Sequence, residues 1–231
     1  EDLVLRNAGV DVYDRWVAGS LPFTSASIRR AFERYGDALL KPGHVHGGID
    51  GAIGAEMSEG MRWLVSEEPI CWLHHQASYA LSYLSPSEMH PETIGYFLTP
   101  VAAPQDSDAL LGSAVFVAAH SDRPEVRELI RFLAGPDYGL TLARSDASGF
   151  IVANRAFDQG YGPSDPRTSL AALAHGALDE GAFRLDASVA MGVESEFRAA
   201  MIGYLEDGSD ALPAILAGLD TTVAHRFEHS E

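Results

Sequence analysis

Apolar side chains in the first third of the chain recur at helical spacing. Val12, Tyr13, Trp16 and Val17 lie on one face of a helix, and Gly19 follows them. This pattern predicts an amphipathic helix that ends before the glycine. Similar patterns predict further helices, at residues 1–5, 28–35, 57–65, 126–133, 138–144, 168–178, 197–205 and 212–227.

Apolar runs of strand length occupy the middle of the chain. We expect strands at residues 70–75, 94–98 and 113–119, and a short apolar segment that turns back into the core at 149–152. The order of strand, polar turn and helix over residues 70–84 is typical of an open α/β sheet, and the helical patterns in the first and last thirds make the chain helix-rich. A polar loop at 104–108 separates two of these strands. Polar loops that join strands in this way often mark a hinge between two lobes.

The stretch from Cys71 to Tyr79 carries the candidate chemistry. It begins as an apolar run, passes through Trp72, His74, His75 and Gln76, and continues into residues 77–84, which read as a helix. Ligands of open α/β sheets bind where strands end and helices begin, because unpaired backbone N–H groups point there. Aromatic, imidazole and amide groups offer stacking faces and hydrogen-bonding edges. The predicted floor of a cleft for an uncharged polar ligand consists of Trp72, His74, His75, Gln76 and Tyr79.

Structural roles are the alternative for each of these residues. The stretch can also be a buried strand with a polar end, in which Trp72 packs into the core. Because successive side chains of a strand alternate between faces, at most one of His74 and His75 faces a ligand directly. For Tyr79 the core position is the favoured interpretation.

The net charge of the 231-residue chain is −17. Such a surface repels nucleic acid phosphates and anionic lipids, so we expect neither as a partner. It also disfavours an anionic ligand and fits a neutral one. The chain has a single cysteine, Cys71, so no intrachain disulfide can form, and its apolar neighbours predict a buried, inert thiol. No apolar run reaches the length of a membrane span.

Nine histidines raise the question of a metal site. His225 and His229 share one helix face, as a zinc pair requires. No HExxH motif, second cysteine or regularly spaced acidic ligand accompanies the histidines, so we expect no metal and no other cofactor. The GxSxG, GxxxxGK and GxGxxG motifs are also missing, so we expect a binding protein rather than an enzyme.

Several short motifs, in this order, resemble the extracellular solute-binding proteins of carbohydrate ABC transporters. They begin with E-D-L-V-L-R at 1–6, V-Y-D-R-W-V at 12–17 and L-P-F-T at 21–24. W-L-H-H-Q-A-S-Y at 72–79 resembles M-H-R-Q-A-S-F of the subgroup that serves alpha-glucosides. R-L-D-A-S at 184–188 resembles its R-x-D-A-S-D segment. Residues 111–119 and the helix at 125–133 match its glycine-led strand and lobe helix.

The resemblance implies a type II periplasmic-binding-protein-like architecture, in which two α/β lobes close on a sugar by hinge motion. Only the C-terminal half of that architecture is covered. On this template, residues 1–105 and 188–231 form the C-terminal lobe, and residues 106–187 form a portion of the N-terminal lobe. Asp186 and Ser188 become further ligand-binding candidates, since a carboxylate and a hydroxyl ahead of a helix can bind sugar hydroxyls. Helix capping by Ser188 is the alternative.

The function implied by the resemblance is capture of a neutral oligosaccharide or glucoside and its delivery to ABC-transporter permease subunits. The implied location is extracytoplasmic, periplasmic or at the cell surface, as a lipoprotein anchored through a preceding N-terminal segment. Three positions depart from the family pattern: His75 replaces arginine, Val189 replaces an acidic residue and Gly192 replaces proline. A sensor or regulatory domain that reuses the half-fold, or a glycoside-processing hydrolase, is therefore the alternative.

Overall fold

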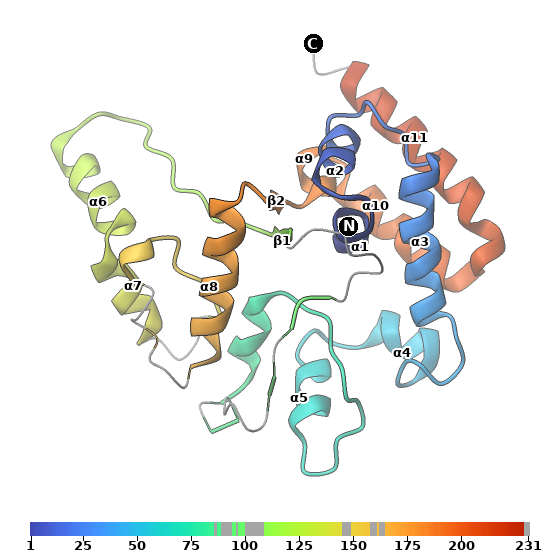
Figure 1. The fold of residues 1–231 in the computed structure, drawn as a ribbon, viewed down its shortest axis with the longest axis horizontal. Helices are drawn as coiled ribbons and strands as arrows, with labels where there is room; N and C mark the ends of the chain where they lie inside the picture. The colour runs from blue at the N-terminus through green and yellow to red at the C-terminus, as the bar shows by residue number, and fades with distance from the viewer. Residues whose placement is uncertain are drawn as a thin grey trace. The chain divides into compact units, whose positions relative to one another are not determined.

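The computed structural model describes residues 1–85, 87–88, 94–95, 97–99, 109–144, 149–157, 161 and 165–228. The chain forms two compact units, which are described separately (Figure 1). The first unit comprises Glu1–Ala55, Thr99–Ser113 and Gly181–Glu231. The second comprises Glu56–Leu98 and Ala114–Glu180.

Helices dominate the first unit. They are α1 (Asp2–Ala8), α2 (Val10–Val17), α3 (Ala26–Leu39), α4 (Gly48–Gly54), α9 (Ala187–Ala190), α10 (Glu194–Asp207), the 3-10 helix η3 (Ser209–Ala211) and α11 (Leu212–Glu228). Strands β1 (Leu110–Gly112) and β2 (Phe183–Leu185) form a parallel pair, with Leu110 opposite Phe183 and Gly112 opposite Leu185.

The core of the first unit is built from aromatic side chains on predicted helix faces. Trp16 of α2 is fully buried and meets Tyr13 and Phe23 edge-to-face, at ring-centroid distances of 5.6 and 5.1 Å. Phe32 of α3 packs edge-to-face against Phe197 of α10. Helix α11 adds the buried side chains of Leu212, Leu216, Leu219 and Val223. The predicted helices at 28–35, 197–205 and 212–227 are therefore confirmed, as is the helix that ends before Gly19.

Two close contacts fix the first unit. Gly36 lies within α3, and a Cβ atom there would overlap the Tyr204 hydroxyl, so the glycine permits the close approach of α3 and α10. The buried Arg6 guanidinium donates hydrogen bonds to the carbonyl oxygens of Thr99 (2.5 Å) and Ala109 (2.9 Å). Arg6 therefore ties α1 to the segment that leads into β1.

The second unit has a smaller core. Its elements are α5 (Glu59–Val65), the 3-10 helix η1 (Ser78–Tyr83), α6 (Pro124–Ala134), α7 (Pro136–Ala143), the 3-10 helix η2 (Arg155–Phe157) and α8 (Pro166–Asp179). Met61 and the η1 side chains Ala80 and Leu81 form the cluster, together with Leu84 and Ile94. Leu170 of α8 packs against this cluster. The helices predicted at 57–65, 126–133, 138–144 and 168–178 are confirmed in type, with shifted ends.

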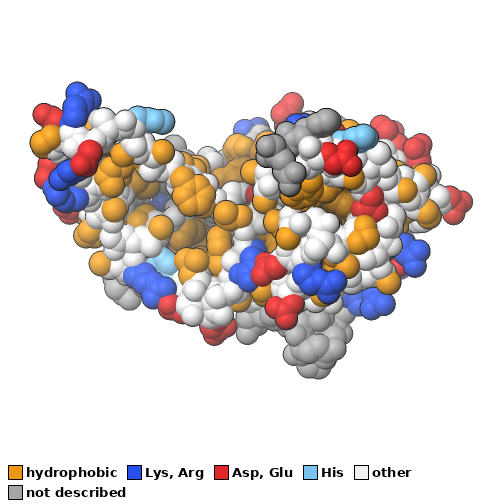
Figure 2. Space-filling view, turned by 90° about the horizontal axis from the view of Figure 1, so that it is seen from above, with side chains coloured by type: hydrophobic (Ala, Val, Ile, Leu, Met, Phe, Trp, Pro, Cys, Tyr) orange, Lys and Arg blue, Asp and Glu red, His pale blue; other side chains and the backbone are white. Residues whose placement is uncertain are grey.

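The strand predictions were wrong for residues 70–75 and 113–119. Both segments are irregular, and neither is paired with any described segment. Val115, Phe116 and Val117 are 80%, 77% and 59% exposed. A strand needs a neighbour for its backbone N–H and C=O groups, and no described part of the second unit supplies one. Figure 2 shows apolar side chains open to solvent over the part of the molecule that contains α6.

Two other segments also differ from expectation. Ile94, Gly95, Phe97 and Leu98 are irregular, and Tyr96 lies outside the described residues. The apolar segment at 149–152 is irregular as well. Strand character in the described chain is limited to the two short strands β1 and β2.

The compact units divide the chain at other positions than the predicted lobes. Residues 56–98, which the lobe assignment joins to residues 1–55, pack with residues 114–180. The reason is the Met61 cluster, which draws α5 and η1 against Leu170 of α8. The assignment of lobes 1–105 with 188–231, and of 106–187, stays a prediction about the family's architecture.

Candidate functional site

The stretch predicted to form the site lies on the surface of the second unit. Residues 71–77 are irregular, and η1 begins at Ser78 in place of the predicted helix over 77–84. The Trp72 side chain is 81% exposed and its neighbour Leu73 is 72% exposed. The alternative in which Trp72 packs into the core is therefore excluded for this structure. An exposed indole face is available for stacking.

His74 is held against α5. A Cβ atom at Gly60 would collide with the His74 ring, so the absence of a side chain at Gly60 makes room for the imidazole. Burial lowers the pKa of His74, and the neighbouring His75 lowers it further. Cys71 lies close by, with its Sγ 3.7 Å from the Gly60 carbonyl oxygen, and burial raises the pKa of its thiol. His74 therefore favours the neutral form, which can both donate and accept a hydrogen bond.

Gln76 and Tyr79 form a polar pair at the start of η1. The Gln76 Oε1 atom accepts hydrogen bonds from the Ala77 amide (3.0 Å) and from the Tyr79 hydroxyl (3.1 Å). The Tyr79 ring is half-buried and packs edge-to-face against Tyr83, and burial raises its pKa. These two hydrogen bonds use the Gln76 side-chain oxygen, so its amide nitrogen can still donate to a ligand. Tyr79 is thus both a packing residue and a partner of Gln76.

Asp186 and Ser188 belong to the first unit. Asp186 follows β2 and is half-buried, and its Oδ2 atom accepts a hydrogen bond from Ser113 Oγ at 2.6 Å. Ser188 is buried, with 6% exposure. The amides of Ala187 and Ser188 donate to the Glu1 carboxylate, at 2.5 and 3.3 Å. Glu1, rather than the predicted Ser188 hydroxyl, therefore satisfies the first amides of α9.

The structure brings the candidate residues together in two separate groups. Trp72, His74, His75, Gln76 and Tyr79 lie in the second unit, and Asp186 and Ser188 lie in the first. That both groups serve one ligand stays a prediction. The sequence reasoning missed Ser113 and Glu1. Glu1 lies 186 positions from Ala187, which no local pattern can reveal, whereas Ser113 could have been found as the first polar residue after an apolar segment.

An open hollow of about 310 Å³ lies beside α6 in the second unit. Its charged lining is internally paired, because Arg127 binds Asp122 and Arg131 binds Glu128. None of the predicted ligand-binding residues lines it. The hollow therefore does not provide the predicted sugar site.

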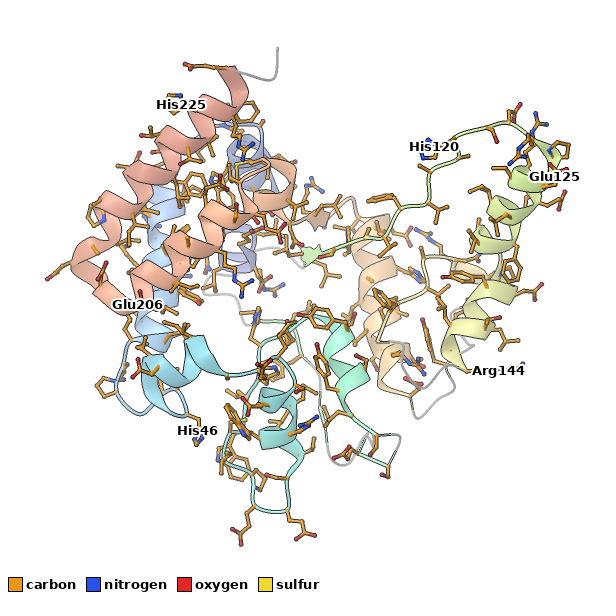
Figure 3. The ribbon with its side chains drawn as sticks, turned by 180° about the vertical axis from the view of Figure 1, so that it is seen from behind. His46, His120, Glu125, Arg144, Glu206 and His225 are labelled. Carbon is orange, nitrogen blue, oxygen red and sulfur yellow. The ribbon has the colours of Figure 1, made fainter. Side chains whose placement is uncertain are left out.

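The histidines do not converge in the described chain. His46, in the loop before α4, and His225, on α11, lie at opposite ends of the first unit (Figure 3). No group of three or more His, Cys, Asp or Glu side chains among the described residues is arranged to hold a metal ion. His229, the second member of the predicted helical pair, lies outside those residues. None of the helices in the described residues is long and apolar enough to cross a membrane.

Comparison with known proteins identifies two relatives. The alpha-glucosides-binding periplasmic protein AglE of Rhizobium meliloti is 33% identical over 141 residues, which are 59% of this chain and 30% of that protein. The osmoprotective compounds-binding protein GgtB of Synechocystis sp. is 29% identical over 135 residues, which are 58% of this chain and 32% of that protein. No known protein family and no solved structure matches the chain.

Both relatives are named for binding a small solute, and neither is named as an enzyme. The matched region spans about a third of the length of each relative. The order of motifs that resembled solute-binding proteins therefore agrees with similarity over more than half of the chain. Over that region, the chain is similar to bacterial solute-binding proteins.

Proposed function

We propose that this chain is part of the solute-binding component of an ABC transporter, which captures a neutral polyhydroxylated solute of the glucoside class. Similarity to an alpha-glucosides-binding periplasmic protein is the observation that carries this proposal. The proposed location is extracytoplasmic, and the proposed partners are the transporter's permease subunits. A type II two-lobe fold with a closing hinge is the architecture that suits this task.

The side chains of residues 72–79 support a saccharide ligand. Sugar rings present C–H groups, which stack on aromatic faces, and hydroxyls, which need planar polar partners. Trp72 offers an open indole face. Gln76 is ordered by Tyr79 and keeps its amide donor, and burial keeps His74 toward its neutral form. A net neutral hydrogen bond contributes only about 0.5–1.5 kcal/mol, so several such groups must act together.

The charge of the chain supports a neutral ligand rather than an anionic one. At −17, the chain repels anions except where a local basic pocket compensates. The arginines beside the hollow at α6 are paired with carboxylates, so they do not create such a pocket.

The test is titration of the native polypeptide that contains these residues with maltose, trehalose and sucrose. Binding should raise the melting temperature and quench tryptophan fluorescence, and the affinity is measured by isothermal titration calorimetry. Trp72→Ala should weaken binding about 10-fold or more, as expected for loss of a stacking anchor. Val115→Ala is the matched control, since Val115 is 80% exposed in the same unit. Failure of all three sugars to bind the native polypeptide would contradict the proposal.

A further inference from the structure

The two parallel strands of the first unit end beside each other. Gly112 of β1 is paired with Leu185 of β2, so the next residues along the two strands are Ser113 and Asp186. The Ser113 hydroxyl donates to Asp186 Oδ2 at 2.6 Å. Both residues belong to one compact unit, so this geometry does not depend on the other unit. Groups that follow the carboxyl ends of parallel strands are where open α/β sheets bind their ligands.

Other polar groups around these strand ends are already engaged. The Asp14 carboxylate accepts two hydrogen bonds from Arg184, at 2.5 and 2.8 Å. The Glu1 carboxylate accepts from two backbone amides, and the Tyr13 hydroxyl donates to the Leu185 carbonyl oxygen at 2.8 Å. These groups serve the fold, and their hydrogen bonds join α1, α2, β2 and α9 to one another.

The Asp186 carboxylate retains capacity to accept hydrogen bonds. Within the described part of the chain, Ser113 is its one hydrogen-bonding partner, through Oδ2. Asp186 is half-buried and Ser113 is exposed, so solvent reaches the pair. An ionised carboxylate offers about four lone-pair sites, and the serine oxygen adds acceptor capacity of its own. The pair is therefore rich in acceptors and needs a ligand with several donors.

Adjacent hydroxyl groups of a sugar or polyol match this requirement. Two neighbouring O–H groups can donate to the two oxygens of one carboxylate, and charge-assisted hydrogen bonds of this kind are stronger than neutral ones. An anionic ligand is disfavoured because Glu1, Asp14 and Asp186 place negative charge at these strand ends, and Arg184 is already neutralised by Asp14.

We propose that Asp186 is a subsite for a vicinal diol of a neutral polyhydroxylated ligand, and that Ser113 is its positioning residue. The Ser113 hydroxyl restrains the carboxylate in one orientation, so that the ligand does not have to order it on binding. This inference rests on the proposed solute-binding function, and it assigns Ser113 a role that the motif at 184–188 does not indicate.

The test uses the native polypeptide and four variants: Asp186→Asn, Ser113→Ala, Ser113→Thr and the control Ser195→Ala. Ser195 is also an exposed serine of the first unit, and its hydroxyl donates to the Glu196 carboxylate at 2.7 Å. Ser195→Ala therefore removes the same kind of hydrogen bond at a position away from the strand ends. Calorimetric titration with maltose, trehalose and sucrose measures the dissociation constant, and thermal unfolding measures stability.

Asp186→Asn should raise the dissociation constant about 10-fold or more, the range for one charged hydrogen bond. Ser113→Ala should raise it about 2- to 10-fold, Ser113→Thr should restore the native value, and Ser195→Ala should leave it unchanged. All melting temperatures should stay within a few degrees. Deoxy analogues of the sugar that binds, each lacking one hydroxyl, are titrated in the same way. Loss of the hydroxyl that contacts Asp186 should weaken binding to the native protein but not to the Asp186→Asn variant.

Two results separate this subsite from the general function. A sugar that binds the native protein could bind the Asp186→Asn and Ser113→Ala variants with the same affinity. That result would overturn the subsite but leave the solute-binding function standing. If no sugar binds the native protein, both proposals fail together. Choline serves as a cationic competitor: displacement of the sugar by choline at comparable concentration would identify a cation site and overturn the diol assignment.

Discussion

The two units of this chain differ in how completely they bury their apolar side chains. Among the described residues, the core of the first unit contains 17 buried apolar side chains, whereas the cluster in the second contains five. Large apolar side chains that remain exposed lie mainly in the second unit, including Trp72, Val115 and Phe116. The apolar face of a helix is buried when a neighbouring helix packs on it. A strand-like segment keeps its backbone and side chains exposed to solvent until another strand pairs with it.

The same substitution in the two cores measures this difference. Leu216 of α11 is fully buried in the first unit. Leu216→Ala should cost about 3–5 kcal/mol of unfolding free energy, the upper part of the range for buried leucine, because the side chain is fully buried in the larger of the two cores. Urea denaturation measures the loss, and amide hydrogen exchange should show faster opening of α3, α10 and α11.

Leu81→Ala is the matched change in the second unit, at a residue that is 2% exposed. We expect a smaller cost of about 2–3 kcal/mol, because the five-residue cluster around η1 is small enough for its side chains to shift into the cavity. Hydrogen exchange should accelerate in α5 and η1 and remain unchanged in α3 and α11. Equal acceleration in both units would show that they unfold as one cooperative body, which would contradict a difference in core stability between them.

Tyr13→Phe probes the joint between α2 and β2. The variant leaves the Leu185 carbonyl oxygen without the hydroxyl that binds it at 2.8 Å. We expect a loss of about 1–2 kcal/mol, the cost of an unsatisfied partly buried acceptor. Tyr138→Phe in α7 is the control, and it should change stability by less than about 0.5 kcal/mol. Thermal unfolding of both variants tests the difference, and equal effects would argue against the Tyr13 bond as a stabilising contact.

Trp72→Ala should leave stability unchanged within about 0.5 kcal/mol, because the side chain is 81% exposed. Trp16→Ala, in contrast, should cost about 3–5 kcal/mol, as for a fully buried tryptophan. Equilibrium denaturation of the pair therefore separates an exposed aromatic face from a core residue. A large loss of stability at Trp72 would mean that the indole is covered in solution.

The smallest expected effect is the pH dependence of His74. Its pKa in the folded state lies below the ordinary value of 6.5, because burial and His75 oppose protonation. The unfolded chain therefore binds the proton more readily, and stability should fall as the pH drops from about 7 through 6.5 toward the lowered value. His74→Gln should flatten the pH dependence in this window. An unchanged profile would show that His74 titrates alike in both states.

Sequence periodicity predicted the helices well because each helix face is encoded within a few consecutive residues. The stripe through Ile28 and Phe32 and the one through Leu216 and Leu219 both became buried faces. The segment at 113–119 failed as a strand because pairing depends on a partner that local sequence cannot specify. Among the described residues, the one strand pairing joins Leu110–Gly112 to Phe183–Leu185, segments that lie more than 70 positions apart.

The candidate site was predicted in part. The motif at residues 72–79 led to side chains that are open to solvent, although as an irregular surface segment rather than a strand tip. The Gln76–Tyr79 hydrogen bond follows from their spacing at the start of a helical turn. The Ser113–Asp186 contact was not predicted, because it depends on the register of two strands. A site made from local motifs can be anticipated, and one made by strand pairing cannot.

One arginine has a consequence for how this fold tolerates change. The Arg6 side chain holds the carbonyl groups of Thr99 and Ala109, the residues on either side of positions 100–108. The entry into β1 is thus anchored from α1, which lies far away in the sequence. A substitution that removed the Arg6 guanidinium would leave both carbonyl oxygens without this donor and would loosen the strand register that places Ser113 beside Asp186.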